Sequence, residues 1–323
     1  MMNITNDYEI KLNQLSFAGA TGLAKFSLNT IISLCESQDI ADFKELVNEI
    51  QTLYDITKKH KPSRAPIENS IEFVLNRAKH WTVSCDNLCD FKSKVKNAAL
   101  SFEDFIEKAQ TQTVKNAVKV LSNTATPITL MTICRSTTVI NTIVKLSKLG
   151  LINKVVVLEA RPDFDGWETA KALGKEGVHV ELIADSAALS FIETIDTVVV
   201  GADVVLDDGS VINRVGTYPL SMFARNYDKY FYVVTASYTF RNLPSQNVVL
   251  AKRDPNKLVP KEISNKWENI VVTNQVDDLT PSNYLTGIIC ETGVLKPNEI
   301  TNNIQRFNSW INNTNSILWN ESI

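Results

Sequence analysis

The sequence predicts an α/β protein in which a helical N-terminal domain, residues 1–122, precedes a Rossmann-like, open and mostly parallel sheet domain, residues 123–295. Two observations support this prediction. Apolar residues recur at three- and four-residue spacing up to about residue 120, as in amphipathic helices. Beyond residue 124, short runs rich in β-branched residues alternate with helical stretches, a pattern that implies parallel strand pairing.

Four stretches of helical periodicity precede the change of pattern. They are residues 23–37, 42–60, 65–81 and 89–121. Asp42 stands at the start of the second stretch, where a carboxylate can accept a hydrogen bond from a backbone N–H of the first helical turn. For most of these stretches the apolar stripe predicts core packing and no further role.

Six short apolar runs follow as predicted strands. They are "PITLMTIC" (127–134), "KVVVLEA" (154–160), "VHVELIA" (178–184), "TVVVGAD" (197–203), "KYFYVVTA" (229–236) and "NIVVTNQ" (269–275). Most are continuous rather than alternating, which is typical of strands buried on both faces. The helix after the first strand should begin after Ser136 and end at Gly150, and the next should end at Gly177.

The last segment, residues 296–323, is rich in asparagine and is predicted to be a peripheral C-terminal extension. Its large apolar residues could dock it onto the rest of the chain or onto a partner. These are Trp310, Ile311, Ile317, Leu318 and Trp319.

The composition excludes several classes of protein. The net charge of −3 over 323 residues gives no reason to expect duplex nucleic acid as a ligand. The N-terminus is polar and no apolar run approaches the ~18 residues needed to span a bilayer, so we expect a cytoplasmic protein without a membrane partner. The five cysteines are sparse and argue against a disulfide framework. Cys85, Cys89 and His80 lack enough neighbouring ligands for zinc, so we expect no metal.

Polar side chains follow the predicted strands where each one ends. They are Cys134, Arg161 with Asp165, Asp185 and Asp203. Open parallel sheets bind ligands beyond the carboxyl ends of their strands, so these residues mark the expected crevice. The sequence has no GxGxxG after the first strand, no GxxxxGK[ST] and no GxSxG. We therefore expect no nicotinamide cofactor, no Walker-type phosphate loop and no serine triad.

Each candidate residue has a structural alternative. Asp203 precedes a predicted Asp-Gly hairpin turn, where a carboxylate can brace a loop or exchange protons in a partly dry crevice. Cys134 can be a small buried hydrophobe, or a thiolate activated near a helix N-terminus. Asn213 and Arg214 offer an amide and a guanidinium to an anion at a helix start, or else are solvated loop residues.

Taken together and in order, these motifs resemble one superfamily. It comprises the alpha, beta and delta subunits of eukaryotic translation initiation factor 2B, their archaeal relatives, methylthioribose-1-phosphate isomerase and ribose-1,5-bisphosphate isomerase. The matching stretches include "SFAGATGLAK" (16–25), "PSRAPIENSIEFVL" (62–75), "TICRSTTV" (132–139), "EARPDFDG" (159–166), "VVVGADVVLDDGSVINRVGTY" (198–218) and "DDLTPSNYLTGIICETGVL" (277–295).

The resemblance implies a dimer or higher assembly built through the sheet domains. In the isomerases a cysteine and an aspartate exchange protons on an open-chain ribose phosphate, and these roles would fall on Cys134 and Asp203. The phosphate and sugar contacts would fall on the side chains of Arg64, Asn213 and Arg214. The backbones of Gly19 and Ala20 would assist them.

The chain departs from the isomerases at several of these positions. Ala18 stands where the isomerases carry an arginine, and Asp165 places an anion where they carry glutamine and where a phosphate would approach. Arg214 keeps the charge of the usual lysine. Ala236 and Thr239 replace an expected glutamate and lysine. At about 4 Å, two like charges repel by one to a few kcal/mol, so the grip on phosphate is expected to be weaker here.

Three functions stay open on the sequence. The departures favour an assembling, regulatory subunit like those of initiation factor 2B, with a nucleotide or sugar phosphate as ligand and a translation initiation factor as candidate partner. The alternative is an aldose–ketose isomerase of a ribose phosphate that uses Cys134 and Asp203. A structure in which Asp165 points away from Arg64 and Arg214 would support this alternative. A scaffold without a small ligand is the third.

Overall fold

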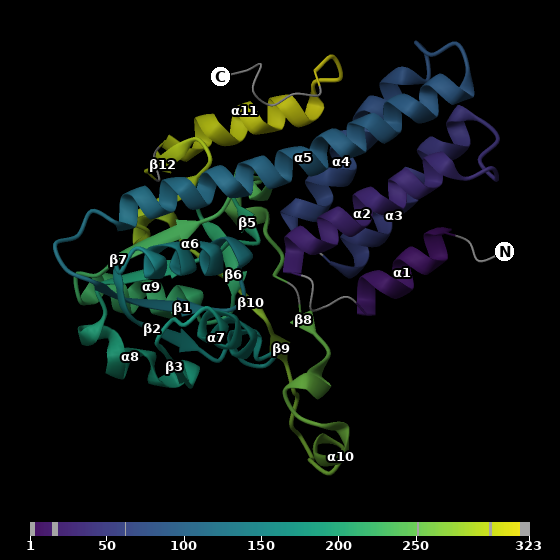
Figure 1. The fold of residues 1–323 in the computed structure, drawn as a ribbon. Helices are drawn as coiled ribbons and strands as arrows, with labels where there is room; N and C mark the ends of the chain where they lie inside the picture. The colour runs from purple at the N-terminus through teal and green to yellow at the C-terminus, as the bar shows by residue number, and fades with distance from the viewer. Residues whose placement is uncertain (1–3, 15–18, 62, 251, 297–298, 317–323) are drawn as a thin grey trace. The chain divides into compact units, whose positions relative to one another are not determined.

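The computed structural model describes residues 4–14, 19–61, 63–250, 252–296 and 299–316. The chain divides into two compact units (Figure 1). The helical unit contains the residues up to Ala109, the segment Ala236–Asn242 and the residues from Asn302 onward, and the sheet unit contains Gln110–Thr235 and Leu243–Thr301. The domain limits predicted from the sequence, at residues 122 and 295, remain a prediction.

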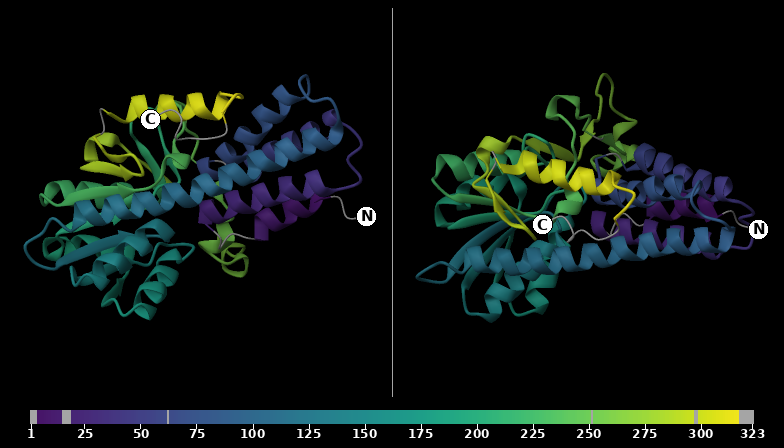
Figure 2. Two further views of the ribbon diagram at one scale, coloured as in Figure 1. Left: turned by 45° about the horizontal axis from the view of Figure 1, so that its top comes forward. Right: turned by 90° about the horizontal axis from the view of Figure 1, so that it is seen from above.

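The helical unit is built from long helices that run alongside one another (Figure 2). They are α1 (Ile4–Gln14), α2 (Gly19–Glu36), α3 (Phe43–His60), α4 (Ala65–Trp81) and α5 (Leu88–Leu121), the last of which continues into the sheet unit. The four predicted helical stretches are confirmed. Asp42 caps α3, because its carboxylate accepts a hydrogen bond from the Glu45 N–H at 2.8 Å. Among the helices of the described ranges, none is both long and apolar enough to cross a membrane.

The C-terminal segment contributes its described part to the core of the helical unit. Helix α11 (Ile300–Asn312) buries one apolar face, including Phe307, Trp310 and Ile311. Trp310 packs against the rings of Phe73 and Phe102, with centroid separations of 4.7 and 5.7 Å. The segment expected to be peripheral thus places one face of α11 in this core, while its other described residues are exposed or half-buried. Ile317, Leu318 and Trp319, also expected to dock it, lie outside the described residues.

A buried arginine on α4 donates hydrogen bonds to the C-terminal end of α11. Arg77 is fully buried, and its guanidinium lies over the Phe73 ring at 3.4 Å from the centroid. Its terminal nitrogens donate to the backbone carbonyls of Ile311 at 3.1 Å, Trp310 at 3.1 Å and Asn313 at 2.6 Å. The last carbonyls of a helix have no partners within the helix, so Arg77 satisfies groups that would otherwise be buried without hydrogen bonds. Burial lowers the pKa of Arg77 to about 9.

Replacing Arg77 by methionine is expected to destabilise the protein by roughly 3–5 kcal/mol, because it leaves several buried carbonyls unpaired. Hydrogen exchange should then accelerate in residues 300–312 more than elsewhere. Lys79→Met, on an exposed position of the same helix, is the matched control and should change neither quantity. Equal exchange rates in α11 for both variants would contradict this role.

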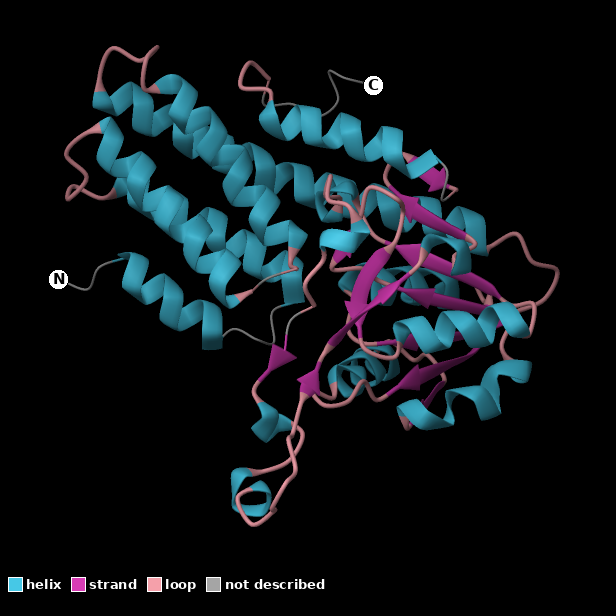
Figure 3. Ribbon diagram, turned by 180° about the vertical axis from the view of Figure 1, so that it is seen from behind, coloured by secondary structure: helices cyan, strands magenta, loops and turns pink. Residues whose placement is uncertain are grey.

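The sheet unit is built on a seven-stranded sheet with the order β12-β11-β7-β4-β1-β2-β3 (Figure 3). The strands are β1 (Ile128–Ile133), β2 (Ile152–Leu158), β3 (Val180–Ile183), β4 (Thr197–Val200), β7 (Tyr230–Val234), β11 (Gly287–Cys290) and β12 (Gly293–Leu295). Each neighbouring pair is parallel except β11 with β12. The predicted open, mostly parallel sheet is therefore confirmed.

Helices cover both faces of this sheet. Helices α6 (Thr137–Lys148) and α7 (Asp165–Lys175), with the end of α5, form one apolar core against alternate strand residues such as Val155 and Val157. Intervening residues such as Val156 point to the other face, where α9 (Thr217–Asn226) packs on β4 and β7. Burial on both faces explains why the strand sequences are continuously apolar.

Two smaller sheets lie outside the main one. Strands β5 (Val204–Val205), β6 (Val211–Arg214) and β10 (Asp277–Thr280) are antiparallel, and the predicted Asp-Gly turn joins the first two. Strands β8 (Lys252–Arg253) and β9 (Asn274–Gln275) form a separate pair, with the short helix α10 (Lys261–Ser264) between them. The predicted strand at 269–275 is wrong except for its last two residues, because Ile270 and Val271 are exposed and lie outside any strand.

Candidate active site

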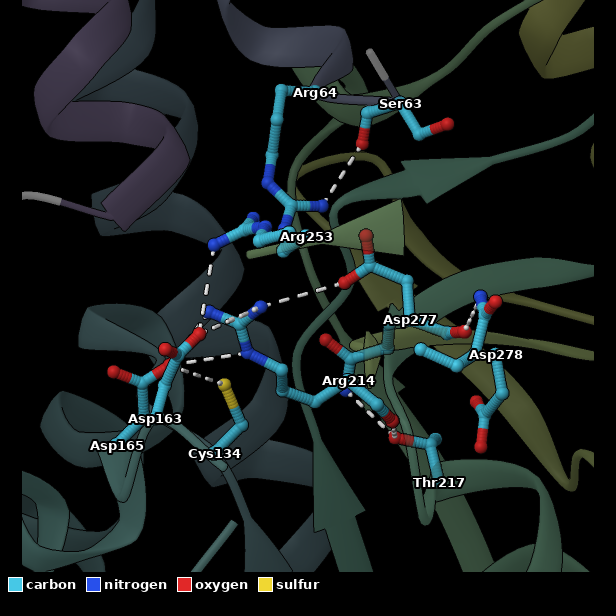
Figure 4. Close-up of polar contacts among 12 residues, drawn as sticks. Ser63, Arg64, Cys134, Asp163, Asp165, Arg214, Thr217, Arg253, Asp277 and Asp278 are labelled. Carbon is cyan, nitrogen blue, oxygen red and sulfur yellow. Dashed lines mark hydrogen bonds and ion pairs between the residues drawn. The ribbon is translucent and has the colours of Figure 1, made fainter. Parts of the chain in front are cut away.

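The carboxyl ends of the strands bring several predicted residues together (Figure 4). Cys134 follows β1, Asp165 opens α7 after β2, and Arg214 is the last residue of β6. Helix α7 can approach β2 closely only because Gly166 has no side chain, since a Cβ there would lie 1.9 Å from the Leu158 carbonyl oxygen. The sheet edge that sequence reasoning identified as a crevice therefore carries a compact polar cluster.

The strongest polar contact of the cluster joins Arg214 and Asp165. One carboxylate oxygen of Asp165 accepts hydrogen bonds from Nη2 of Arg214 at 2.7 Å and from Nε at 3.1 Å. Asp165 therefore points toward Arg214, contrary to the geometry that the isomerase hypothesis favoured. The remaining nitrogen, Nη1, is buried and makes no hydrogen bond, although Asp277 and Asp163 lie 3.5 and 3.7 Å away.

Several acids surround this one buried guanidinium. Burial alone would lower the pKa of Arg214, but the negative charges of Asp165, Asp203 and Asp277, with that of Cys134 once its thiol ionises, raise it above its ordinary value. Arg214 therefore stays charged at every pH at which the protein is folded. Its own charge and those of Lys257 and Arg253 outweigh the effect of burial on Asp163 and hold the pKa of that carboxyl below its ordinary range.

Cys134 sits half-buried at the centre of the cluster. Its backbone is left-handed, with a φ of 69°, and its carbonyl accepts a hydrogen bond from the Thr169 hydroxyl at 2.7 Å. The sulfur lies 3.8 Å from a carboxylate oxygen of Asp165. Burial, partly offset by Arg214 and reinforced by Asp165 and Asp203, raises the pKa of the thiol to about 12. Cys134 is therefore a protonated thiol at neutral pH.

Asp203 completes the pair that the resemblance singled out. Its backbone N–H donates to the Ile212 carbonyl at 3.0 Å, which fixes it at the end of β4 beside the hairpin. The carboxylate is near enough to raise the pKa of both Cys134 and Arg214 through its charge. Among the described residues, no group of three or more His, Cys, Asp or Glu side chains has a metal-binding arrangement.

The start of α9 differs from the predicted anion site. Asn213 is buried, and its amide donates to the Thr217 hydroxyl at 3.1 Å. The backbone N–H groups of Gly216 and Tyr218 donate to one carboxylate oxygen of Asp278, at 2.8 and 3.0 Å. Asp278 thus occupies the helix N-terminus that was expected to receive a phosphate. Its second oxygen, Oδ1, is buried without a hydrogen-bond partner.

Asp278 makes a pH-dependent contribution to stability. Burial, only partly offset by the N–H groups of α9, raises its pKa from 3.8 to about 7. Between these pH values the folded protein binds a proton that the unfolded chain releases, so the stability due to this proton is lost as the pH rises. As the pH rises from 4 to 8, the unfolding free energy of Asp278→Asn should increase by roughly 2–4 kcal/mol relative to that of wild type. Urea titrations across this range measure the change. The control is Asp39→Asn, at an exposed position, whose unfolding free energy should differ from that of wild type by a constant amount at every pH. A constant difference between Asp278→Asn and wild type would contradict the assignment.

The other predicted binding residues belong to the helical unit. Gly19 is the first residue of α2, with a φ of 66°, and Ala20 follows it. Arg64 precedes α4, is buried, and donates from Nη1 to the Ser63 carbonyl at 3.1 Å. Ala18 lies outside the described residues. Ala236 and Thr239, which replace charged family residues, are buried, and the Thr239 hydroxyl donates to the Ala236 carbonyl at 2.8 Å.

Sequence reasoning missed several members of the cluster. Asp163 and Asp277 contact Arg214, and Arg253 and Lys257 contact Asp163. The adjacent acids of "RPDFD" and "DDLTP" were a signal for the first two, since both lie in stretches that carry the family resemblance. The two basic residues gave no signal, because only the folded path of residues 252–257 brings them to Asp163.

The fold and the cluster define an α/β protein with a thiol and several carboxylates around one arginine at the strand ends of a parallel sheet. Residues 17–297 match the model of the Initiation factor 2 subunit family, and the chain belongs to that family. It is 30% identical, over 290 residues, to a protein of Pyrococcus furiosus named ribose 1,5-bisphosphate isomerase, with 89% of each chain covered.

Solved structures agree with this assignment. A structure of the Pyrococcus horikoshii translation initiation factor eIF-2B superposes with a TM-score of 0.78 at 26% identity, covering 92% of this chain and 98% of the other. The 5-methylthioribose 1-phosphate isomerase of Pyrococcus horikoshii superposes with a TM-score of 0.74 at 21% identity, covering 94% and 87%. The second likeness shows a shared fold.

Proposed function

We propose that this protein is an aldose–ketose isomerase of a phosphorylated ribose, with ribose 1,5-bisphosphate as the first candidate substrate. The observation that carries the proposal is the presence of the Cys134 thiol, the Asp203 carboxylate and the charged Arg214 in one polar cluster, where Asp165 lies 3.8 Å from the Cys134 sulfur and 2.7 Å from Arg214. The similarity to the Pyrococcus furiosus enzyme over 89% of the chain supports the same function. This was the alternative hypothesis from the sequence, and the comparisons favour it over the regulatory one.

The protonation states suggest how the two groups divide the work. Because O1 carries a phosphate, the Cys134 thiol gives its proton to the ring oxygen O4 as the C1–O4 bond breaks and the sugar chain opens. Asp203 takes the proton from C2, and that electron pair forms the C1–C2 double bond of an enol phosphate. Asp203 then returns its proton to C1, and the thiolate takes the proton from the O2 hydroxyl as the ketone forms at C2. Both residues end in their starting states, so atoms and charges balance.

Arg214 has a separate role in this scheme. Its Nη1 makes no hydrogen bond within the described part of the chain and can donate to a substrate oxygen. Negative charge develops on O2 as the enol hydroxyl loses its proton, and a buried cation placed in advance stabilises that charge strongly. The pair with Asp165 orients the guanidinium through its other two nitrogens.

One observation favours a second candidate function. Because Asp165 occupies Nε and Nη2 of Arg214, a phosphate that approaches this arginine has to compete with an internal anion. A pocket of that kind suits a subunit of the initiation factor 2B type that assembles with further copies or partners and senses a ligand without converting it. Translation initiation, an oligomeric state and a nucleotide ligand belong to this candidate.

An activity assay separates the two candidates. Purified protein is incubated with ribose 1,5-bisphosphate and, separately, with methylthioribose 1-phosphate, and the ketose product is measured. Conversion of either supports the isomerase. If neither is converted, and a nucleotide or sugar phosphate raises the melting temperature, the result would support the ligand-sensing subunit instead.

A further inference from the structure

Charge is distributed unevenly along the cluster. The buried part of the cluster contains the cation Arg214. Asp165, Asp277 and Asp163 lie within 4 Å of this arginine, and the charge of Asp203 also acts on it. Acids therefore outnumber bases around Arg214. At this separation each like-charge contact with an incoming phosphate would cost about 4 kcal/mol at an effective dielectric of 20, so the depth of the cluster disfavours a phosphate dianion.

Two further cations lie on the solvent side of the same cluster. Arg253 approaches Asp163 at 3.5 Å through Nη1, and the ammonium of Lys257 contacts the other carboxylate oxygen at 2.5 Å. The Asp163 side chain is 9% exposed, whereas those of Arg253 and Lys257 are 24% and 45% exposed. Asp163, already in contact with Arg214, thus also lies within ion-pair distance of two further cations at this outer edge.

Local structure fixes both cations in place. Arg253 lies on β8, which pairs with β9, and the Asn274 amide donates to the Asp254 carbonyl at 2.8 Å. The turn Pro255–Lys257 follows, and the Asp254 carboxylate caps it by accepting a hydrogen bond from the Asn256 N–H at 3.0 Å. Arg253 and Lys257 are therefore positioned before any ligand arrives, which reduces the entropy lost on binding.

We propose that Arg253 and Lys257 form a phosphate-binding subsite at the outer edge of the cluster, for a phosphate group of the ribose bisphosphate. This inference rests on the proposed function for the identity of the ligand. An ammonium has three N–H donors, and the contact with Asp163 uses one of them. The half-exposed Lys257 can therefore bind a phosphate oxygen and keep its ion pair. Asp163 acts as the positioning residue that turns both cations toward the crevice.

The subsite also gives a physical reason for the departures at Ala18 and Thr239. The chain lacks the phosphate-binding arginine that the resemblance implies at position 18 and the lysine expected at position 239, and it carries an extra anion at Asp165. Two cations at the outer edge supply positive charge where Asp163 is the carboxylate within ion-pair distance of both among the described residues. Phosphate recognition has then moved outward, while Arg214 remains for the sugar oxygens.

Calorimetric binding of ribose 1,5-bisphosphate tests the subsite. Lys257→Ala and Arg253→Ala should each weaken binding by about 10- to 100-fold, as expected for losing a charge-assisted contact with phosphate. The dependence of Kd on salt should fall in both variants. Lys252→Ala, an exposed lysine on the same strand, is the matched control and should stay within about 2-fold of wild type. Lys257 is half-exposed, so its variant keeps the test valid if Arg253→Ala fails to fold.

The outcomes separate this inference from the proposed function. If wild type binds the bisphosphate in a manner that depends on Lys257 but produces no ketose, the subsite stands and the isomerase proposal falls. If wild type turns over and both variants keep its Kd and KM within 2-fold, the isomerase stands and the subsite is overturned. No detectable binding by wild type would also overturn the subsite.

Discussion

Cys134→Ser is expected to lower kcat for ribose 1,5-bisphosphate by about 10²–10⁴-fold, the usual contribution of a positioned acid–base group. A serine hydroxyl fits the space of the thiol but is a far weaker acid. The half-buried side chain makes a long contact with Asp165, at 3.8 Å, which a hydroxyl can replace, so the unfolding free energy should change by less than about 1 kcal/mol. Steady-state kinetics and urea titration measure the two effects. Cys89→Ser, at an exposed cysteine, is the matched control.

The pH profile tests which role Cys134 plays. With a pKa raised to about 12, the thiol is protonated throughout the neutral range, so an acid role predicts no change in kcat/KM from this group between pH 7 and pH 10. A base role in the free enzyme would require the thiolate, and kcat/KM would then climb about tenfold per pH unit over the same interval. A steep rise would therefore contradict the division of work between Cys134 and Asp203. Substantial activity in Cys134→Ser would contradict a chemical role altogether.

Asp165→Gln is expected to have two effects of opposite sign. Removing the anion releases Nε and Nη2 of Arg214, so ribose 1,5-bisphosphate should bind about 10- to 100-fold more tightly, equivalent to about 1–3 kcal/mol. The protein without ligand should become less stable by about 1–3 kcal/mol, because a buried guanidinium loses its best acceptor. Calorimetry measures the first effect and urea titration the second.

Glu168→Gln provides the control for this substitution. Glu168 lies in the first turn of the same helix, α7, but is exposed and makes only a 3.8 Å ion pair with Lys171. It should leave both affinity and stability near the wild-type values. Weaker binding in Asp165→Gln would show that Asp165 assists the ligand rather than competing with it.

The sequence predicted the parts of the fold that depend on local pattern. Helix α4 follows the stretch 65–81 because its apolar period is regular and a proline stands in its first turn. The core strands were found because burial on both faces makes them continuously apolar. Residues 269–275 satisfied the same composition rule but failed, since β-branched residues also occur in an exposed segment and composition does not report which neighbours a strand will have.

The candidate site was predictable only in part. Cys134, Asp165 and Asp203 follow directly from the rule that ligands bind at strand ends, and Arg214 from its place before α9. The contact between Asp165 and Arg214 joins residues 49 positions apart, and that between Asp163 and Lys257 joins residues 94 apart. Neither has a local signal. The occupation of the α9 N-terminus by Asp278 likewise depends on β10 pairing with β6, which no stretch of sequence specifies by itself.

A proton NMR time course of the purified protein with ribose 1,5-bisphosphate in deuterated buffer tests the isomerase proposal most directly. We predict that the aldose signals decline while those of the corresponding ketose appear. Conversion should be lost in both Cys134→Ser and Asp203→Asn, while circular dichroism shows that both variants remain folded. Two results would contradict the isomerase assigned to this site. One is an aldose spectrum that stays unchanged with wild-type protein, and the other is conversion by a variant that carries both Cys134→Ser and Asp203→Asn.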